Sequence, residues 1–282
     1  MKKLIINADD FGLTRDISDK IIETYKIGNL SSTSLMVNTP ASDYAIKLAK
    51  KNPKLGVGLH FNLTEGKALT GISSITDLNG FFFNKMRINL FKTLRIIDLK
   101  DIKNELNMQF EYITNAGLSP SHIDSHQHIH MNPGIFRVVA DFAKEKKVSI
   151  RIAFPQFIKR PEGKISYIKR LKQLILEYAS YKNAFYAENI SVKFNKSFNS
   201  IFDYHPFKMP IKNDYINLVK KSISDQHEVM IHLYQESQEL KSFYGKKYEG
   251  KRMFFKKANA ELKILSKESV FSSYKLANFK DL

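Results

Sequence analysis

An α/β fold in which strands and helices alternate is the architecture that this sequence predicts. Short apolar runs recur along the chain, and the segments between them place apolar residues at helical spacing. The chain has 282 residues. This length fits one (βα)-barrel domain or two small domains, because barrel folds often occupy about 250 residues as one unit. Since we find no internal repeat and no linker, we predict a single domain over residues 1–282.

The first half of the chain contains the clearest strand and helix patterns. The segment 16–27 is typical, because Ile17, Ile21, Ile22 and Tyr25 share one helical face and Gly28 follows them. Strands are expected at residues 4–7, 33–38, 55–61, 121–125 and 148–153, and helices at 16–27, 41–50, 102–116 and 133–146.

The remaining segments have weaker or more unusual patterns. Residues 66–90 are expected to form a long loop with an aromatic, glycine-containing tip at 79–83, and loops of this length are usually functional or mobile. Residues 160–181 read as a basic amphipathic helical insert. Beyond it we expect weak strand signals at 190–201, a helix at 210–224, a strand at 228–232 and a charged helix at 246–265.

Composition excludes several classes of protein. With 43% hydrophobic residues, 12 glycines and 8 prolines, the chain is neither disordered throughout nor collagenous. It has no cysteine, so a metal site must use histidine and carboxylate ligands. The apolar run at the start is broken at Asn7 and Asp9, and no stretch approaches the roughly 20 apolar residues of a membrane span. We therefore expect a cytoplasmic protein.

The formal charge of +17 comes mostly from 37 lysines, with only 8 arginines. Arginine is the residue preferred for planar phosphate recognition, and lysine-rich chains often reflect compositional drift. We interpret the charge first as a solvated lysine surface and expect no nucleic-acid partner. The alternative is attraction to an acidic substrate or an anionic membrane surface.

Ionisable residues follow five apolar strands at the point where each strand ends. These residues are Asp9 and Asp10, His60, the cluster His126, His128 and His130, Arg151, and His232. The carboxyl ends of parallel strands meet at one edge of the sheet, where sites are built from several strands. The sequence therefore predicts one functional site at that edge.

Each of these groups also has a purely structural interpretation. Asp9 and Asp10 could cap the following turn, and His60 or His232 could be a hydrogen-bonded core histidine. The cluster is harder to explain that way, because His122, Asp124, His126, His128 and His130 fall within nine residues. Either a strand or a helical turn would bring imidazoles together there. Aspartate with histidine suits zinc, manganese or another divalent ion, with open positions for water.

The motifs together identify a family resemblance that spans roughly the first 235 residues. The sequence resembles the YdjC/ChbG-like carbohydrate deacetylases in its motifs NADDFGLT at 7–14, SSTSLMVN at 31–38, GLHFNLTEGKAL at 58–69, HIDSHQHIHM at 122–131, SIRI with Arg151, AFYAE at 184–188 and EVMIH at 228–232. It departs from the family pattern at Ala187, and at Leu233 and Tyr234, which follow His232.

The resemblance implies an irregular TIM-like (βα)-barrel that removes an acetyl group from an N-acetylated sugar, either an oligosaccharide or a lipid-linked hexosamine. It also implies a divalent metal, most often magnesium, with zinc or another transition metal as the alternative. Carried over by position, the metal ligands are Asp10, His60 and His126; the catalytic residues are Asp9 as general base, with Arg151 and His232; and His128, His130 and Asn62 contact substrate or orient ligands.

The chemistry of amide hydrolysis agrees with these assignments. A metal lowers the pKa of a water molecule that it holds, to about 7 in the best zinc sites, and this water attacks the acetyl carbonyl. Asp9 can accept the proton of the water, and an imidazolium can protonate the departing nitrogen.

Two other functions fit the same residues and stay open. A metal-dependent phosphoesterase would use the same ligands, and a non-catalytic protein could bind anionic surfaces through its lysines. The basic insert could also contact a membrane peripherally, although packing against the barrel is the simpler expectation. The resemblance makes a homodimer an expectation as well.

Overall fold

Seven parallel strands form one curled sheet in the computed structural model, which describes residues 3–154, 167–204, 208–220 and 224–282. The spatial order of the strands is β5-β4-β3-β2-β1-β7-β6. Their bounds are β1 (Lys3–Phe11), β2 (Ser32–Leu35), β3 (Gly56–Phe61), β4 (His122–Ser125), β5 (Ser149–Ile150), β6 (Ser197–Ser200) and β7 (Gln226–Ile231).

The two edges of the sheet approach each other beyond β5 and before β6. Ile150 forms an isolated parallel bridge with Phe194. The Oδ1 atom of Asn195 accepts the backbone N–H of Ile152 at 2.7 Å, and its Nδ2 donates to the Ile152 carbonyl at 2.9 Å. The α/β class with a curled parallel sheet is thus confirmed, whereas the irregular TIM-like barrel stays a prediction.

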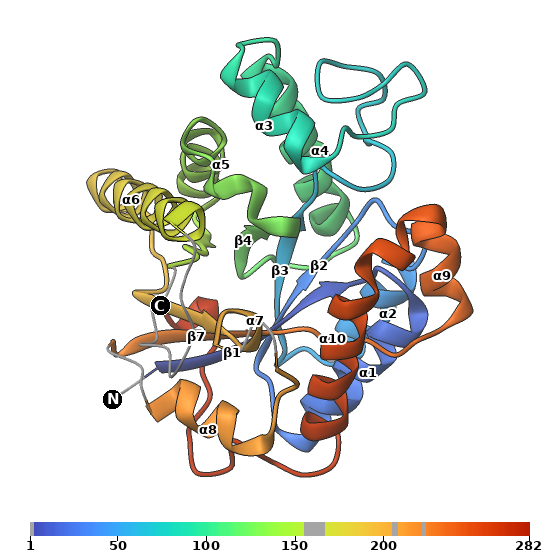
Figure 1. Cartoon of the computed structure of the whole chain (residues 1–282), viewed down its shortest axis with the longest axis vertical. Helices are drawn as coiled ribbons and strands as arrows, with labels where there is room; N and C mark the ends of the chain where they lie inside the picture. The colour runs from blue at the N-terminus through green and yellow to red at the C-terminus, as the bar shows by residue number, and fades with distance from the viewer. Residues whose placement is uncertain (1–2, 155–166, 205–207, 221–223) are drawn as a thin grey trace.

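Helices surround this sheet (Figure 1). In the view of Figure 1, α1, α2, α9 and α10 lie on the right, α5 and α6 on the left, α8 at the bottom, and α3 and α4 at the top. The bounds are α1 (Arg15–Ile27), α2 (Ser42–Lys51), α3 (Lys85–Thr93), α4 (Leu99–Asn115), α5 (Pro133–Lys146), α6 (Tyr167–Asn189), α7 (Ile201–Tyr204), α8 (Lys212–Lys220), α9 (Gln238–Tyr244) and α10 (Arg252–Leu265), with the 3₁₀ turns η1 (His126–Met131), η2 (Gly245–Lys247), η3 (Glu249–Lys251) and η4 (Phe279–Asp281).

Helix α1 shows how closely local sequence determines an element. The Thr14 side chain accepts the backbone N–H of Ile17 at 3.2 Å, which caps the helix at its start. The apolar face with Ile17 and Ile21 is fully buried against the sheet. Gly28 ends the helix with a left-handed φ of 89°, a conformation that favours glycine.

The predicted loop at 66–90 is wrong at its carboxyl end, where helix α3 begins at Lys85. Asn84 caps this helix by accepting the N–H of Arg87 at 3.0 Å, and Ile88 is buried beneath it. The Arg87 guanidinium lies 4.1 Å from the ring centroid of Phe83. The aromatic tip therefore supports a helix that its own sequence pattern did not indicate.

Other bounds also differ from the prediction. The strand expected at 148–153 is reduced to Ser149–Ile150, and the helix expected at 246–265 begins only at Arg252, after two 3₁₀ turns. Residues 160–166 of the expected basic insert lie outside the described residues, and the rest falls in α6, which continues to Asn189. No helix within the described ranges is long and apolar enough to span a bilayer.

At the start of β4, the His122 side chain packs against the carboxyl-terminal segment of the chain. The His122 ring stacks on Phe279, with ring centroids 3.9 Å apart. Gly58 on the neighbouring strand makes room for this ring, because a Cβ at position 58 would lie 2.3 Å from it. Burial lowers the pKa of His122 to about 3, so this histidine is a neutral core residue.

Candidate metal centre and active site

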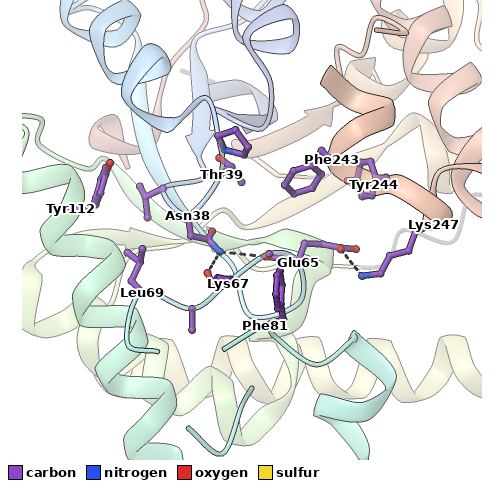
Figure 2. A pocket seen from close by; sticks show the side chains of 14 residues that line it. Asn38, Thr39, Glu65, Lys67, Leu69, Phe81, Tyr112, Phe243, Tyr244 and Lys247 are labelled. Carbon is purple, nitrogen blue, oxygen red and sulfur yellow. Dashed lines mark hydrogen bonds and ion pairs between the residues drawn. The ribbon is translucent and has the colours of Figure 1, made fainter. Parts of the chain in front are cut away.

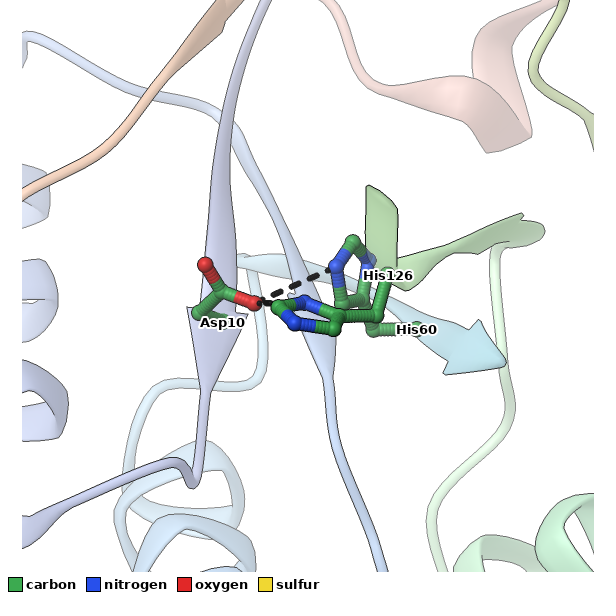
Figure 3. Close-up of side chains that lie close together, drawn as sticks. All are labelled: Asp10, His60 and His126. Carbon is green, nitrogen blue, oxygen red and sulfur yellow. Dashed lines mark hydrogen bonds and ion pairs between the residues drawn. The ribbon is translucent and has the colours of Figure 1, made fainter. Parts of the chain in front are cut away.

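Asp10, His60 and His126 meet at the carboxyl edge of the sheet (Figure 3). Oδ1 of Asp10 lies 2.8 Å from Nδ1 of His126 and 3.3 Å from Nε2 of His60. The three residues are buried, and one ligand atom from each lies within 4.8 Å of the others. One carboxylate and two imidazoles, from β1, β3 and the turn η1, form a donor set suited to a divalent cation.

The backbone at the end of β1 is bent to place Asp10. The register of β1 against β2 shifts between Ala8 and Phe11, and Asp10 has a φ of 66°. A non-glycine residue in the left-handed region stores strain of about 1–3 kcal/mol and is often part of a functional site. Gly12 follows with a φ of 89°, where a Cβ would lie 2.8 Å from the carbonyl oxygen of Met36.

A second strained segment places the histidines after β4. Gln127 and His128 have φ values of 56° and 53° inside η1, so two consecutive residues are left-handed. His126 and His128 both line the same cavity as a result. His126 Nε2 and His128 Nδ1 are buried and have no hydrogen-bond partner among the described residues. These nitrogens are available to a ligand.

Asp124 orients the His60 ring from the side opposite Asp10. Its Oδ1 lies 2.8 Å from Nδ1 of His60, which directs Nε2 toward Asp10. Its Oδ2 accepts the hydroxyl of Ser34 at 2.6 Å. A carboxylate on the far nitrogen of a metal-binding histidine fixes the ring and its tautomer.

Arg151 lies fully buried among three carboxylates. Its Nη1 and Nη2 lie 2.8 and 2.7 Å from the two oxygens of Asp9, an end-on bidentate pair. Its Nε and Nη2 lie 2.8 and 2.6 Å from Oε1 of Glu228, and Nη1 lies 2.7 Å from Oδ2 of Asp124. The five contacts equal the number of N–H donors on a guanidinium. Asp9 receives a further hydrogen bond from Asn7 at 2.9 Å, so its carboxylate is held rigidly beside the candidate metal ligands.

The charges in this cluster shift several pKa values. Burial alone would lower the pKa of His60, but the Asp124 and Asp9 carboxylates raise it to about 10. Burial would raise the pKa of Asp10, yet His126 and His60 hold it well below its usual range. For Glu228, burial outweighs the attraction of Arg151 and raises the pKa to about 7. A cation at Nε2 of His60 would displace the proton there, since metal binding needs a neutral imidazole.

His232 and Tyr234 lie on the other side of Asp10. The hydroxyl of Tyr234 donates to Oδ2 of Asp10 at 2.6 Å, and Nε2 of His232 lies 3.8 Å from the same oxygen. The His232 ring packs edge-on against Phe202 and Phe254, at centroid distances of 5.2 and 5.0 Å. Burial lowers the pKa of His232, and its Nδ1 has no hydrogen-bond partner among the described residues.

The site opens into a cavity of about 800 Å³. Side chains of α6 and several phenylalanines form an apolar wall, which includes Ile175, Leu176, Phe154 and Phe254. The polar wall contains most of the residues that the sequence singled out: Asp9, Asp10, His60, His126, His128 and His232.

Three residues singled out by the sequence do not line this cavity. Arg151 lies behind Asp9, as described above. Nε2 of His130 lies 2.9 Å from the Arg151 carbonyl oxygen, so His130 fixes the backbone of that arginine. Asn62 organises its own turn, because its Oδ1 accepts the N–H groups of Thr64 and Glu65 at 3.0 and 3.2 Å.

Glu228 and Tyr234 contact the site although the sequence did not indicate them, and Asp124, which the sequence indicated only as part of the histidine cluster, orients His60. Strand alternation contains a signal for all three. Tyr234 is two residues after His232, Glu228 is four residues before it, and Asp124 pairs directly with His60 in the sheet register. These contacts could not be predicted, because a local sequence pattern does not show which strands are neighbours in the sheet.

The fold and the site define a class: an α/β protein with a buried carboxylate–imidazole cluster where several parallel strands end. The family model described as "YdjC-like protein" matches residues 3–275. The chain therefore belongs to the YdjC-like family, as its motifs indicated.

Curated relatives match about half of the chain. A carbohydrate deacetylase of Clostridium beijerinckii (strain ATCC 51743 / NCIMB 8052) is 41% identical over 150 residues, 53% of this chain and 59% of the relative. A carbohydrate deacetylase of Geobacillus stearothermophilus is 40% identical over 147 residues, 52% of this chain and 58% of the relative. A chitooligosaccharide deacetylase of Yersinia pestis (strain Pestoides F) is 42% identical over 158 residues, 54% of this chain and 59% of the relative. The matched part thus spans less than two thirds of each of these relatives.

A solved structure shows the same fold over nearly the whole chain. It is a protein of Enterococcus faecalis V583, described as a candidate cellobiose-phosphate cleavage protein. The match has a TM-score of 0.73 and covers 99% of this chain and 98% of the other. With 23% sequence identity, this likeness concerns the fold alone.

Proposed function

We propose that this protein is a metal-dependent hydrolase that removes the acetyl group from an N-acetylated sugar. The observation that supports this most directly is the buried cluster of Asp10, His60 and His126, which opens into the cavity with Asp9 beside it. The names of the curated relatives agree with this reaction. We also propose that the fold is a TIM-like barrel and that residues 1–282 form a single domain.

Asp10, His60 and His126 would hold the divalent metal, because their ligand atoms are close together, buried and on the cavity wall. When bound, such an ion lowers the pKa of water and polarises a carbonyl oxygen. Two imidazoles and one carboxylate favour zinc or another transition metal, whereas magnesium prefers oxygen ligands. Magnesium remains the prediction from the family resemblance, and adding metals back one at a time to chelated protein distinguishes the two.

Asp9 would act as the general base. Arg151 and Asn7 occupy two acceptor positions on its Oδ1, and Arg151 occupies one on its Oδ2. A carboxylate has about four acceptor positions, so Oδ2 keeps one for the proton of a nucleophilic water. The bidentate pair also prevents the carboxylate from rotating, which keeps that position fixed relative to the substrate.

His232 would protonate the departing nitrogen. Its lowered pKa makes the imidazole neutral near pH 7, so it must gain a proton during the reaction before it can donate one. His128 lines the same cavity, its Nδ1 has no hydrogen-bond partner in the part of the chain that the structure describes, and it is a candidate contact for the sugar.

The test is acetate release from N-acetylhexosamine oligomers by Asp10→Ala and His126→Ala variants. Both should lose activity and metal affinity together, because each removes one of three ligands. Asp141→Ala, which removes an exposed carboxylate that accepts a hydrogen bond from Tyr186, is the matched control and should behave as wild type. Normal turnover in either ligand variant would contradict the proposal.

A phosphoesterase fits the site less well. Arg151 is the cation nearest to the catalytic carboxylate, and all its donors are engaged by carboxylates. The carboxylates of Asp9, Asp10 and Asp124 would repel a phosphate dianion bound in the cavity. Release of phosphate but not acetate, over a panel of phosphoesters and acetamides, would favour this alternative.

The apolar wall of the cavity is the observation that favours a lipid-linked form of the sugar. Ile175 and Leu176 of α6 line the cavity, yet they are 59% and 49% exposed. Comparing acetate release from soluble and lipid-linked sugars in a Leu176→Asn variant tests this form. Peripheral membrane contact, a homodimer and a cytoplasmic location remain predictions, to be tested by vesicle binding, sedimentation and fractionation.

A further inference from the structure

His232 lies just beyond the end of the parallel sheet. The pairing of β7 with β1 ends at Ile231, and its pairing with β6 ends at Met230. Residues 232–237 follow without regular secondary structure. A buried backbone group that has no partner in a sheet needs a partner elsewhere, and His232 is buried. Contacts from outside the sheet must therefore hold this part of the backbone.

The imidazole of His232 is not fixed by a close polar contact. Its Nε2 lies 3.8 Å from Oδ2 of Asp10, which is beyond hydrogen-bond distance. Its Nδ1 has no hydrogen-bond partner in the ranges that the structure describes, whereas catalytic histidines are often oriented by a hydrogen bond at the second ring nitrogen. The position of this ring therefore depends on aromatic packing and on the backbone that carries it.

The carboxyl-terminal helix α10 provides both kinds of support. Oε2 of Glu261 accepts the backbone N–H of His232 at 3.0 Å. Phe254 lies two helical turns before Glu261, on the same face of α10, and its ring packs edge-on against the imidazole with centroids 5.0 Å apart. One face of this helix thus contacts the backbone and the ring of His232.

Glu261 is itself held in place by a second hydrogen bond. The hydroxyl of Tyr215, on α8, donates to Oε1 of Glu261 at 3.0 Å, and both side chains are fully buried. Burial raises the pKa of Glu261 to about 8, so the carboxyl group is mostly neutral near pH 7. Burying a carboxyl group is costly compared with an apolar side chain, but an apolar side chain could not accept the His232 N–H. Glu261 therefore contributes a hydrogen-bond acceptor rather than a charge.

Tyr234, which donates to Asp10, is held by other residues. Nδ2 of Asn259 donates to the Tyr234 carbonyl at 3.0 Å. The Tyr234 hydroxyl shares a hydrogen bond with Tyr244, which also lines a second hollow of about 670 Å³ (Figure 2). Because none of these contacts includes Glu261, a substitution of Glu261 should leave Tyr234 and its hydrogen bond to Asp10 in place.

We propose that Glu261 is a positioning residue for His232, whose backbone it holds so that the imidazole reaches the departing nitrogen. This inference rests on the proposed deacetylase function, in which His232 donates the proton. A proton donor must come within about 2.6–3.2 Å of its acceptor, and a misplacement of about 1 Å can cost roughly 100-fold in rate.

The first test compares acetate release from N-acetylglucosamine oligomers by Glu261→Leu and Glu261→Gln variants. Leucine has no acceptor for the His232 N–H, so kcat should fall about 10- to 100-fold while KM and metal affinity stay within about twofold of wild type. Glutamine can accept this N–H with its oxygen and donate to the Tyr215 hydroxyl with its amide nitrogen, so kcat should recover to within about threefold of wild type.

The control is Glu268→Leu, which removes an exposed carboxylate just beyond α10 that pairs with Lys212 at 2.8 Å, and it should behave as wild type. Circular dichroism of each variant checks that the protein is folded. If Glu261→Leu does not fold, Glu261→Ala takes its place, because water can fill the space and satisfy the His232 N–H without fixing it. Wild-type kcat in the folded leucine or alanine variant, or a folded Glu261→Gln as slow as that variant, would refute the proposal.

A double-mutant cycle tests whether Glu261 acts through His232. In a His232→Gln background, which already lacks the acid, Glu261→Leu should lower kcat by less than about twofold further. A fall of about 10- to 100-fold in both backgrounds would show that Glu261 acts on another group, and the proposal would be wrong.

The histidine ring signals in ¹H–¹³C NMR spectra of chelator-treated protein give a readout that is independent of catalysis. The His232 signal, assigned by its absence from His232→Gln, should shift in Glu261→Leu and stay near its wild-type position in Glu261→Gln. The signal of His122, whose ring stacks on Phe279, should not move in either variant. An unmoved His232 signal in Glu261→Leu would overturn the proposal. If the signal moves but wild-type protein releases acetate from no sugar, the placement of His232 by Glu261 stands and the deacetylase proposal fails.

Discussion

Replacing Arg151 with lysine should destabilise the protein strongly, although the charge is kept. The guanidinium makes five contacts of 2.6–2.8 Å with Asp9, Asp124 and Glu228. An ammonium has three donors on one nitrogen and cannot reproduce a planar fork. At least one buried carboxylate would then lose its partner.

The magnitude follows from this unpaired carboxylate. Breaking a buried ion pair by removing one partner costs about 3–5 kcal/mol, a large part of a typical stability of about 5–15 kcal/mol. For a chain of this size, each kcal/mol lowers the melting temperature by about 2–4 °C, so we expect a decrease of roughly 6–20 °C. Asp9 would also lose its fixed orientation, and activity should fall with it.

Thermal unfolding followed by circular dichroism in the presence of a chelator measures this effect without any contribution from metal binding. Arg137→Lys is the control, since Arg137 is exposed and lies over the ring of Tyr186. We expect it to change stability by less than about 0.5 kcal/mol. A decrease of under 2 °C for Arg151→Lys would refute the argument that the fork geometry holds the three carboxylates.

Two further substitutions test the neighbours of the site. Tyr234→Phe removes the hydroxyl that donates to Asp10 and should weaken metal affinity, measured by equilibrium dialysis, about 10- to 100-fold. The control Tyr215→Phe changes a buried tyrosine that is hydrogen-bonded to Glu261 and should keep the wild-type affinity. Equal metal affinities of the two variants would contradict the role of Tyr234. Glu228→Gln replaces a carboxyl whose folded pKa is raised from 4.5 to about 7, so the wild type loses stability relative to the variant as pH rises from about 4.5 to about 7. The amide nitrogen can occupy the place of Oε2, which has no partner among the described residues, and its oxygen can still face Arg151. Parallel stability–pH curves for the two proteins would show that Glu228 does not titrate in this range.

The strands and the residues at their ends could be predicted because they depend on short-range patterns. The apolar run before Asp9 and the alternation around His60 are local signals, and the parallel arrangement converts them into one site. The structure brings Asp10, His60 and His126 together accordingly. To predict this cluster, only one assumption was needed, namely that the strands end at the same edge of one sheet.

The contacts between neighbouring strands could not be predicted in the same way. Gly58 looks like a weak point in a strand, yet it is the position where the His122 ring fits. Ser34, within SSTSLMVN on β2, donates to Asp124 of β4, although β3 lies between these two strands. Helix α3 depends on an asparagine cap and on packing that follow no apolar period. Each of these features depends on which segments are adjacent in space.

The distribution of charge links the fold to the proposed chemistry. The whole chain has a formal charge of +17, but the described residues at the site include four buried carboxylates, Asp9, Asp10, Asp124 and Glu228, and one buried arginine, Arg151. Burying this excess of negative charge is costly unless cations or protons compensate it. The raised pKa values of His60 and Glu228 show that protons provide part of that compensation. A divalent cation would replace the proton on His60, so metal binding should release protons and stabilise the folded protein more strongly as pH rises toward 10.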